Sequence, residues 1–211
     1  MGIVWWYIAF FLYLCKLSNE YGMNYKNLFE KTIQLLSSPA KAWTEIEGEQ
    51  KSDKVMSEFV YPMIGFCGLS VFVGIFIGNT AGVSAFQIAM TRCCATFVSL
   101  FGGFFLAAYL MNLLGKYLLG RGDELEQNQR FVGYAMVVTF VLNIVSGLFS
   151  ISILHWIFQF YTVFVAYEGA RVLMKVDEKD LTRYSLIASV IIIVCPGVIA
   201  TIFDKLSLIL N

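Results

Sequence analysis

Apolar residues fill four long stretches of this chain in which no Asp, Glu, Lys or Arg occurs. A helix needs about 20 apolar residues to cross a hydrocarbon core of about 30 Å, so each stretch can hold one or two spans. The alternation of lipid-facing and lumen-facing residues that is typical of membrane strands is missing, which favours helices. The stretches predict an all-α integral membrane protein with five transmembrane helices, at about 59–78, 89–114, 131–148, 151–168 and 184–203.

Glycines and polar residues mark the expected turns between spans. The sequence Gly-Asn-Thr-Ala-Gly at 78–82 would leave backbone groups that lipid cannot satisfy, so the first span should end there. The charge-free stretch at 131–167 is too long for one helix and close to right for two. Ser146, Gly147 and Ser150 therefore predict a tight hairpin between the third and fourth spans.

Two short amphipathic helices are expected before the first span. Over Tyr25–Leu36, apolar residues fall on one arc of a helical wheel and polar residues fill the other. Ser38 is expected as the N-cap of a second helix that begins at Pro39, with Ala42, Trp43 and Ile46 on the same face. We therefore divide the chain into an apolar N-terminal segment, cytoplasmic amphipathic helices and a five-helix membrane domain, at 1–22, 23–57 and 58–211.

The apolar N-terminal segment is open to three interpretations. Residues 3–17 are almost wholly apolar but short for a span, and they lack the basic n-region and cleavage site of a signal peptide. They can be an interfacial segment, a sixth short span, or residues upstream of a true start at Met23. The glutamates at 45, 47 and 49 are interpreted as a solvated helix end.

The positions of the charged residues predict how the chain is oriented in the membrane. The chain has 15 basic and 15 acidic residues among 58% hydrophobic ones, and zero net charge argues against a nucleic-acid partner. With five spans, all basic residues except Arg92 and Lys205 fall on the side of the N-terminus. Because basic loops stay inside, this predicts a cytoplasmic N-terminus and places Asn211 outside.

Residues that could carry out catalysis are scarce. His155 is the single histidine, whereas a zinc site needs three or four ligands and a hydrolase needs a nucleophile with its base. The cysteines form no CxxC pair and are expected to be reduced packing residues, at Cys15, Cys67, Cys93, Cys94 and Cys195. We predict no catalytic, cofactor-binding or metal-binding residues, and no enzyme.

Polar residues inside the spans have two interpretations. Arg92 is expected as an anchor at a span end, and Asn112, Asn143 and Gln159 are expected as interhelical hydrogen-bond partners. The alternative is a small transporter or channel subunit in which these four residues line a polar path.

Small residues predict close helix packing. Gly74 and Gly78 form a GxxxG pattern, and Gly102 and Gly103 leave one side of the second span without bulky side chains. The pattern can serve internal packing or a homo-oligomer. Pro196 is expected to kink the fifth span because it removes a backbone hydrogen bond.

Several short motifs occur in an order that resembles the Yip family, the Ypt/Rab-interacting membrane proteins, and in particular its bacterial branch. The likeness covers about residues 23–203. It includes the third-to-fourth hairpin and the motifs Leu35-Leu36, Pro39 to Trp43 to Ile46, Tyr61-Pro62, Gly120–Gly122, Phe131–Ala135 and Tyr167–Gly169.

The resemblance implies a function only in outline. Eukaryotic relatives bind small GTPases, but this chain lacks the Asp-Leu-x-Gly-Pro segment before the spans, so GTPase binding is not carried across. We expect a non-enzymatic protein of a bacterial inner membrane with an unknown biochemical role. Its expected partners are the lipid bilayer and an unidentified membrane or cytoplasmic protein at the cytoplasmic face.

Overall fold

The structure is a computed structural model, and it describes residues 25–49, 55–78, 83–149 and 157–209. Every element in these residues is helical, as predicted. The helices are α2 (Tyr25–Ser37), α3 (Pro39–Gly48), η1 (Met56–Val60), α4 (Tyr61–Gly78), α5 (Val83–Leu119), α6 (Leu125–Ala135), α7 (Val137–Phe149), α9 (Tyr161–Val172) and α10 (Glu178–Ile209).

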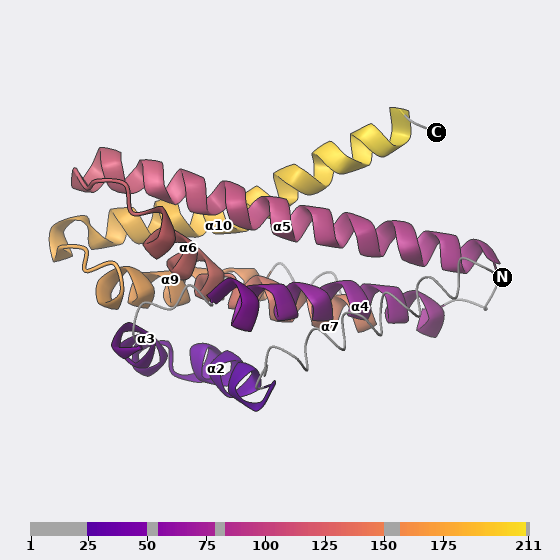
Figure 1. The fold of residues 1–211 in the computed structure, drawn as a ribbon, viewed down its shortest axis with the longest axis horizontal. Coiled ribbons are helices and arrows are strands. Elements are labelled where there is room, and N and C mark those ends of the chain that lie inside the picture. Colours follow the sequence, from indigo (N-terminus) through magenta and orange to yellow (C-terminus); the bar gives the residue numbers. More distant parts are fainter. Residues whose placement is uncertain (1–24, 50–54, 79–82, 150–156, 210–211) are drawn as a thin grey trace.

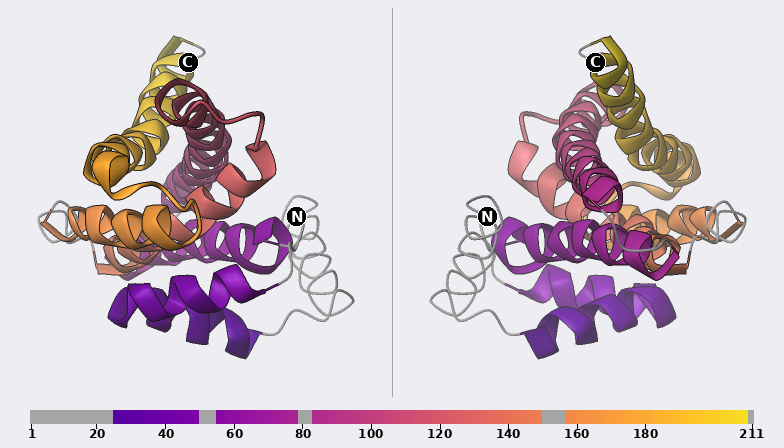
Figure 2. Two further views of the ribbon diagram at one scale, coloured as in Figure 1. Left: turned by 90° about the vertical axis from the view of Figure 1, so that its left-hand side faces the viewer. Right: turned by 90° about the vertical axis from the view of Figure 1, so that its right-hand side faces the viewer.

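Long helices run side by side along one axis of the molecule (Figure 1). Helix α5 packs against α4 and α10, and α4 packs against α7. Helices α2 and α3 form a layer on the flank opposite α10 (Figure 2). Four of the described helical stretches are long and apolar enough to cross a membrane, at Met56–Ile77, Ala85–Leu119, Leu125–Phe149 and Glu178–Leu206.

Glycines allow two of these helix pairs to approach closely. A Cβ added at Gly74 would collide with the backbone carbonyl of Gly147, so α4 and α7 touch backbone to backbone. A Cβ at Gly103 would lie 2.6 Å from the Cα of Pro196, which brings α5 onto α10 in the same way. The GxxxG glycine Gly74 therefore serves packing within the chain.

The second and fifth expected spans are parts of longer helices. The charge-free residues predicted 89–114 and 184–203, whereas α5 and α10 extend beyond both ends of those ranges. Charged residues such as Lys116 and Asp180 lie within these helices. Charges mark where a helix leaves the hydrocarbon and do not mark where its backbone hydrogen bonding stops. Figure 1 shows that α10, which contains Pro196, changes direction along its length.

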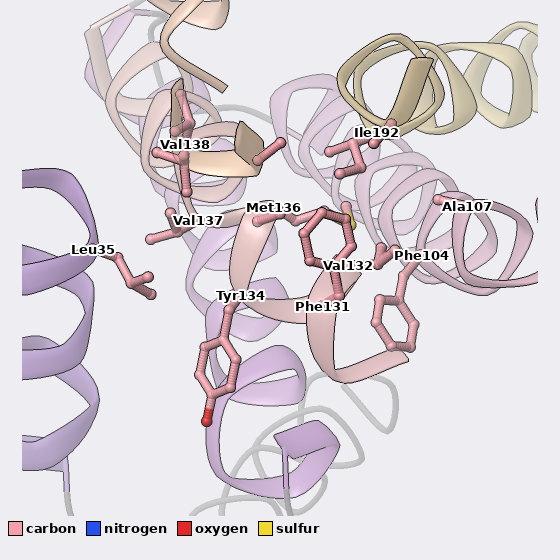
Figure 3. Close-up of a cluster of buried hydrophobic side chains, with 14 of the residues drawn as sticks. Leu35, Phe104, Ala107, Phe131, Val132, Tyr134, Met136, Val137, Val138 and Ile192 are labelled. Carbon is pink, nitrogen blue, oxygen red and sulfur yellow. The ribbon is translucent and has the colours of Figure 1, made fainter. Parts of the chain in front are cut away.

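The third expected span differs at its start and in its middle. We predicted 131–148, but the helix begins at Leu125, and α6 and α7 are separated at Met136. The Met136 N–H still bonds to the carbonyl of Val132, 2.9 Å away, so the two helices form one apolar stretch with a local distortion. Figure 3 shows the buried residues around this point, with Phe131 and Val132 near Phe104 and Ile192.

The first span also starts differently from the prediction. Helix α4 is preceded by a π-helical turn, η1, whose last bond runs from the Tyr61 N–H to the carbonyl of Met56. Pro62 follows this turn and has no N–H to donate, so it cannot continue the ordinary helical bonding pattern. Tyr61-Pro62 therefore lies in the first turn of α4, directly after a helical distortion.

The fourth expected span, 151–168, begins among residues that lie outside the described part of the chain. The described helix there is α9, which runs from Tyr161 to Val172 and thus ends four residues later than predicted. The N-terminal segment 1–22, His155 and the turn at 79–82 also lie outside the described residues.

Candidate functional site

A cleft of about 940 Å³ opens at one end of the bundle, and both polar and apolar side chains line it. It lies where the end of α3, the connection between α5 and α6, and the connection between α9 and α10 come together. Charged and amide side chains supply most of its polar lining, which comprises Glu47, Glu49, Arg121, Asp123, Glu124, Glu126, Gln127, Gln129, Arg130 and Lys175. None of these residues was predicted from the sequence as a binding residue.

Two arginines hold the cleft together by binding backbone carbonyls at helix ends. The Arg130 guanidinium on α6 donates hydrogen bonds to the carbonyls of Ile46 and Glu49, where α3 ends. The Arg121 guanidinium donates to the carbonyls of Met174 and Lys175, after α9. The last carbonyls of a helix lack partners within it and carry partial negative charge, so a guanidinium there supplies both hydrogen bonds and charge.

Ion pairs connect the same elements around the cleft. Lys175 lies 2.7 Å from Glu47, and Lys31 of α2 lies 2.7 Å from Glu49. Burial alone would lower the pKa of Lys31, but the hydrogen bond and charge of Glu49, with a smaller contribution from Tyr134, raise it overall. The glutamates that we interpreted as a solvated helix end therefore join α3 to α2 and to the chain after α9.

The connection between α5 and α6 is fixed by a second polar network. Asn112 donates to a carboxylate oxygen of Asp123 at 2.8 Å and accepts the Glu124 N–H at 3.1 Å. Lys116 lies 3.2 Å from the same carboxylate. Gly120, in between, has a φ of 61°, a conformation that favours glycine. Asn112 was predicted as an interhelical partner; its side-chain oxygen also accepts a hydrogen bond from Asn128 of α6 at 3.5 Å, and the same side chain orders this connection.

This network predicts a specific dependence on pH. The hydrogen bond from Asn112, and then Lys116, lower the pKa of the Asp123 carboxyl below its ordinary value near 4. The contribution to stability is therefore complete above that value and is lost as the pH falls through the lower folded-state pKa. Replacing Asn112 by alanine should raise the Asp123 pKa in an NMR titration, and Lys116→Met should raise it as well. An unchanged Asp123 titration in both variants would contradict this account.

Trp43 anchors α3 to the membrane-spanning helices beside the cleft. Its side chain is completely buried, and its indole N–H donates to the carbonyl of Val165 on α9 at 2.9 Å. The ring stacks on Phe131 at 5.8 Å between centroids and meets Tyr134 edge-on. Gly169 makes room for the indole, because a Cβ there would lie 2.7 Å from the ring.

Motifs that are far apart in the sequence therefore meet at this end of the molecule. Trp43, Phe131 and Gly169 come from three of the motifs that carried the family resemblance, and they form one contact. Arg121 lies in the Gly120–Gly122 motif and borders the cleft. Motif order was the sequence signal for Arg121. Arg130 lies in no motif, and residue type alone did not distinguish it from other basic residues.

The four intramembrane polar residues do not come together. Arg92 is exposed on α5, and Asn112 belongs to the network beside Asp123. Asn143 donates to the Thr139 carbonyl of its own helix, and Gln159 donates to the Thr139 hydroxyl at 2.9 Å. Only Asn143 and Gln159 share a neighbour, so the described residues give no continuous polar path of the predicted composition.

The cleft presents charged groups together with hydrogen-bond donors and acceptors. Its carboxylates and guanidinium groups can bind a polar surface, and most of them already join helix ends. Among the residues that the structure describes, no group of three or more His, Cys, Asp or Glu side chains could hold a metal ion.

We predict that Arg130 is needed for the position of α3. The variant Arg130→Ala leaves the carbonyls of Ile46 and Glu49 without their charged donor, so α3 should lose about 1.5–3 kcal/mol of local stability. Hydrogen exchange of the α3 amides measures this loss. Arg130→Lys should restore only part of it, because an ammonium lacks the planar fork of donors. Exchange at wild-type rates in Arg130→Ala would show that the contact is dispensable.

The helical bundle of the described residues and its apolar spans define an integral membrane protein built of helices. Residues 33–199 match the family model described as the Yip1 domain, and the chain belongs to this family. The match confirms the resemblance based on motif order. No curated protein and no solved structure matches the chain.

Proposed function

We propose that this protein is a non-enzymatic membrane protein that acts through protein or lipid interactions at its cytoplasmic face. The cleft at the polar end of the bundle supports this proposal, because charged side chains of α3, α6 and the α5–α6 and α9–α10 connections gather there. The family match supports membrane association. The residues with family motifs also build this end, which favours a role in recognition there.

The proposed topology has five spans, with the N-terminus in the cytoplasm, the C-terminus outside, and a bacterial inner membrane as the location. Residues 23–57 would then be cytoplasmic helices and residues 58–211 the membrane domain. The connections after α5 and after α9 meet at the cleft, since Gln127 donates to the Leu173 carbonyl at 3.0 Å. A return pass between α7 and the end of α9 is consistent with the expected fourth span, 151–168, and so with a total of five spans. The distribution of basic residues favours this end as the cytoplasmic one.

Site-specific photocrosslinking in cells tests the proposed role. A photoreactive residue at Gln129, which lines the cleft, should give a discrete crosslinked partner or lipid adduct. The matched control is the same residue at Val190, which is 59% exposed on α10 within a candidate span. Adding Arg130→Ala should abolish the Gln129 product and leave the Val190 products unchanged. Identical products at both positions, or a product insensitive to Arg130→Ala, would contradict recognition at the cleft.

A further inference from the structure

Helix α2 has an apolar edge that the other described helices leave exposed. One face of α2 packs into the molecule, where Leu28 and Leu35 are buried. Next to this face, Phe29 is 52% exposed and Ile33 is 64% exposed. At 100° per residue, Phe29 and Ile33 lie about 40° apart on the wheel, and Tyr25 extends the same edge. The exposed residues therefore form one apolar edge.

The opposite edge of α2 is polar and faces the cleft end of the molecule. Lys31 donates a hydrogen bond to Glu49 at 2.8 Å, and Gln34 donates to Glu45 at 2.7 Å. Both glutamates belong to the end of α3, which borders the cleft. These two hydrogen bonds fix the rotation of α2 about its own axis. The polar edge of α2 faces the cleft, and the apolar edge faces away from it.

Helix α2 contacts residues of two neighbouring helices that lie about two helical turns from the nearest charged residue at the cleft end of each helix, toward the middle of the bundle. The Phe29 ring lies 5.9 Å from the Phe66 ring, and Phe66 follows Glu58 by about two helical turns, or about 12 Å. At the other end, the Tyr161 hydroxyl donates to the Leu36 carbonyl at 2.7 Å. Tyr161 precedes Glu168 by about two turns on α9. Helix α2 therefore lies across the axis of the bundle at nearly constant depth.

The apolar edge is continuous with the surface of a candidate span. Phe66, Leu69 and Val73 follow one another on one side of α4, at the i, i+3 and i+7 positions. Leu69 is 42% exposed and Val73 is 39% exposed, on a helix long and apolar enough to cross a membrane. A lipid-facing surface on α4 thus leads directly to the exposed edge of α2.

We infer that α2 is an in-plane membrane helix whose edge Tyr25, Phe29 and Ile33 contacts the acyl chains of the cytoplasmic leaflet. An amphipathic helix of this kind buries its apolar face about 5–10 Å below the boundary between headgroups and acyl chains, which agrees with the depth of Phe66 and Tyr161. Lys26 and Glu30, which are largely exposed and 3.8 Å apart, border the edge and face the headgroups. Assignment of this leaflet as cytoplasmic rests on the proposed function.

Helix α2 would thereby set the position of the cleft relative to the bilayer. It is joined to α3 by Lys31 and Gln34, and α3 ends at the cleft. With the apolar edge in the acyl chains, the cleft lies at the membrane surface, where both lipid headgroups and a peripheral protein can reach it. This deepens the proposed role by assigning the lipid-binding element.

Spin labels on α2 test the inference in the full-length protein. The protein, with its native cysteines replaced, is reconstituted into vesicles of phosphatidylethanolamine and phosphatidylglycerol and labelled at Phe29→Cys, Ile33→Cys or Glu30→Cys. Relaxation by oxygen, which concentrates in lipid, is compared with relaxation by a water-soluble nickel complex. The ratio of oxygen to nickel accessibility should be several-fold higher at positions 29 and 33 than at the matched control position 30.

Other outcomes would overturn the inference. A ratio at 29 and 33 that is equal to or lower than the ratio at 30 means that the edge faces water. Spin–spin broadening at 29 or 33 means that a second copy of the chain covers it, and low accessibility to both reagents means that protein covers it. The ratio does not depend on which leaflet is cytoplasmic or on the cleft, so it can fail while crosslinking at Gln129 succeeds, and the reverse.

Discussion

Replacing Trp43 by alanine is expected to release α3 from the bundle at a cost of about 3–5 kcal/mol. The substitution removes a completely buried indole, its hydrogen bond to Val165 and its stacking on Phe131. Gly169, which lies against the indole, has no side chain that could fill the resulting cavity. Hydrogen exchange of the α3 amides, with trypsin cleavage after Lys41 as a second readout, measures the release.

Two neighbouring variants separate the contributions of the indole. Trp43→Phe keeps an aromatic ring and loses the N–H donor, which leaves the Val165 carbonyl without this partner and should cost about 1–3 kcal/mol. Thr44→Ala changes an exposed residue of the same helix and should have an effect within about 0.5 kcal/mol. If Trp43→Ala behaves like Thr44→Ala, then α3 is held by other contacts and the account of this anchor is wrong.

Replacing Gly74 by leucine should separate α4 from α7 and destabilise the membrane domain by about 3 kcal/mol. A Cβ at this position collides with the Gly147 carbonyl, and backbone cannot move aside as a flexible side chain can. Unfolding of the purified protein in mixed micelles with increasing SDS measures the change in free energy.

Gly65 on the same helix provides the matched control for Gly74. A Cβ at Gly65 meets nothing within 4 Å, so Gly65→Leu should change the free energy of unfolding by no more than about 0.5 kcal/mol. Equal destabilisation by the two variants would mean that leucine on α4 is unfavourable in itself. Equal stability of the two would mean that α4 and α7 are not in backbone contact.

Much of the fold follows from where charged residues are absent. Apolar stretches predicted an all-helical membrane protein, and four of the expected spans coincide with apolar helices of sufficient length. The ends of α5 and α10 could not be predicted in this way, because helices continue through charged residues once they leave the hydrocarbon. The distortion at Met136 depends on packing among α6, α7 and their neighbours, for which the local sequence gives no signal.

The candidate site could not be predicted because contacts between residues far apart in the sequence build it. Helix α3 begins at Pro39 and buries Ala42, Trp43 and Ile46, the residues that the helical wheel placed on one face. The partner of that face is determined by residues such as Gly169, more than a hundred positions away. Ser38, the expected N-cap, makes no side-chain capping bond. Arg130 likewise binds carbonyls of a segment far away in the sequence, and no spacing rule connects them.

Accessibility of two introduced cysteines from the two sides of the membrane tests the central claim most directly. Glu126→Cys lies in the cleft and Lys205→Cys lies near the other end of α10, and both parent residues are exposed. In cells that express the protein with its native cysteines replaced, a membrane-impermeant maleimide should label Lys205→Cys from outside and Glu126→Cys only after the cells are opened. Labelling of Glu126→Cys in intact cells would contradict a cytoplasmic cleft, and with it the proposed function.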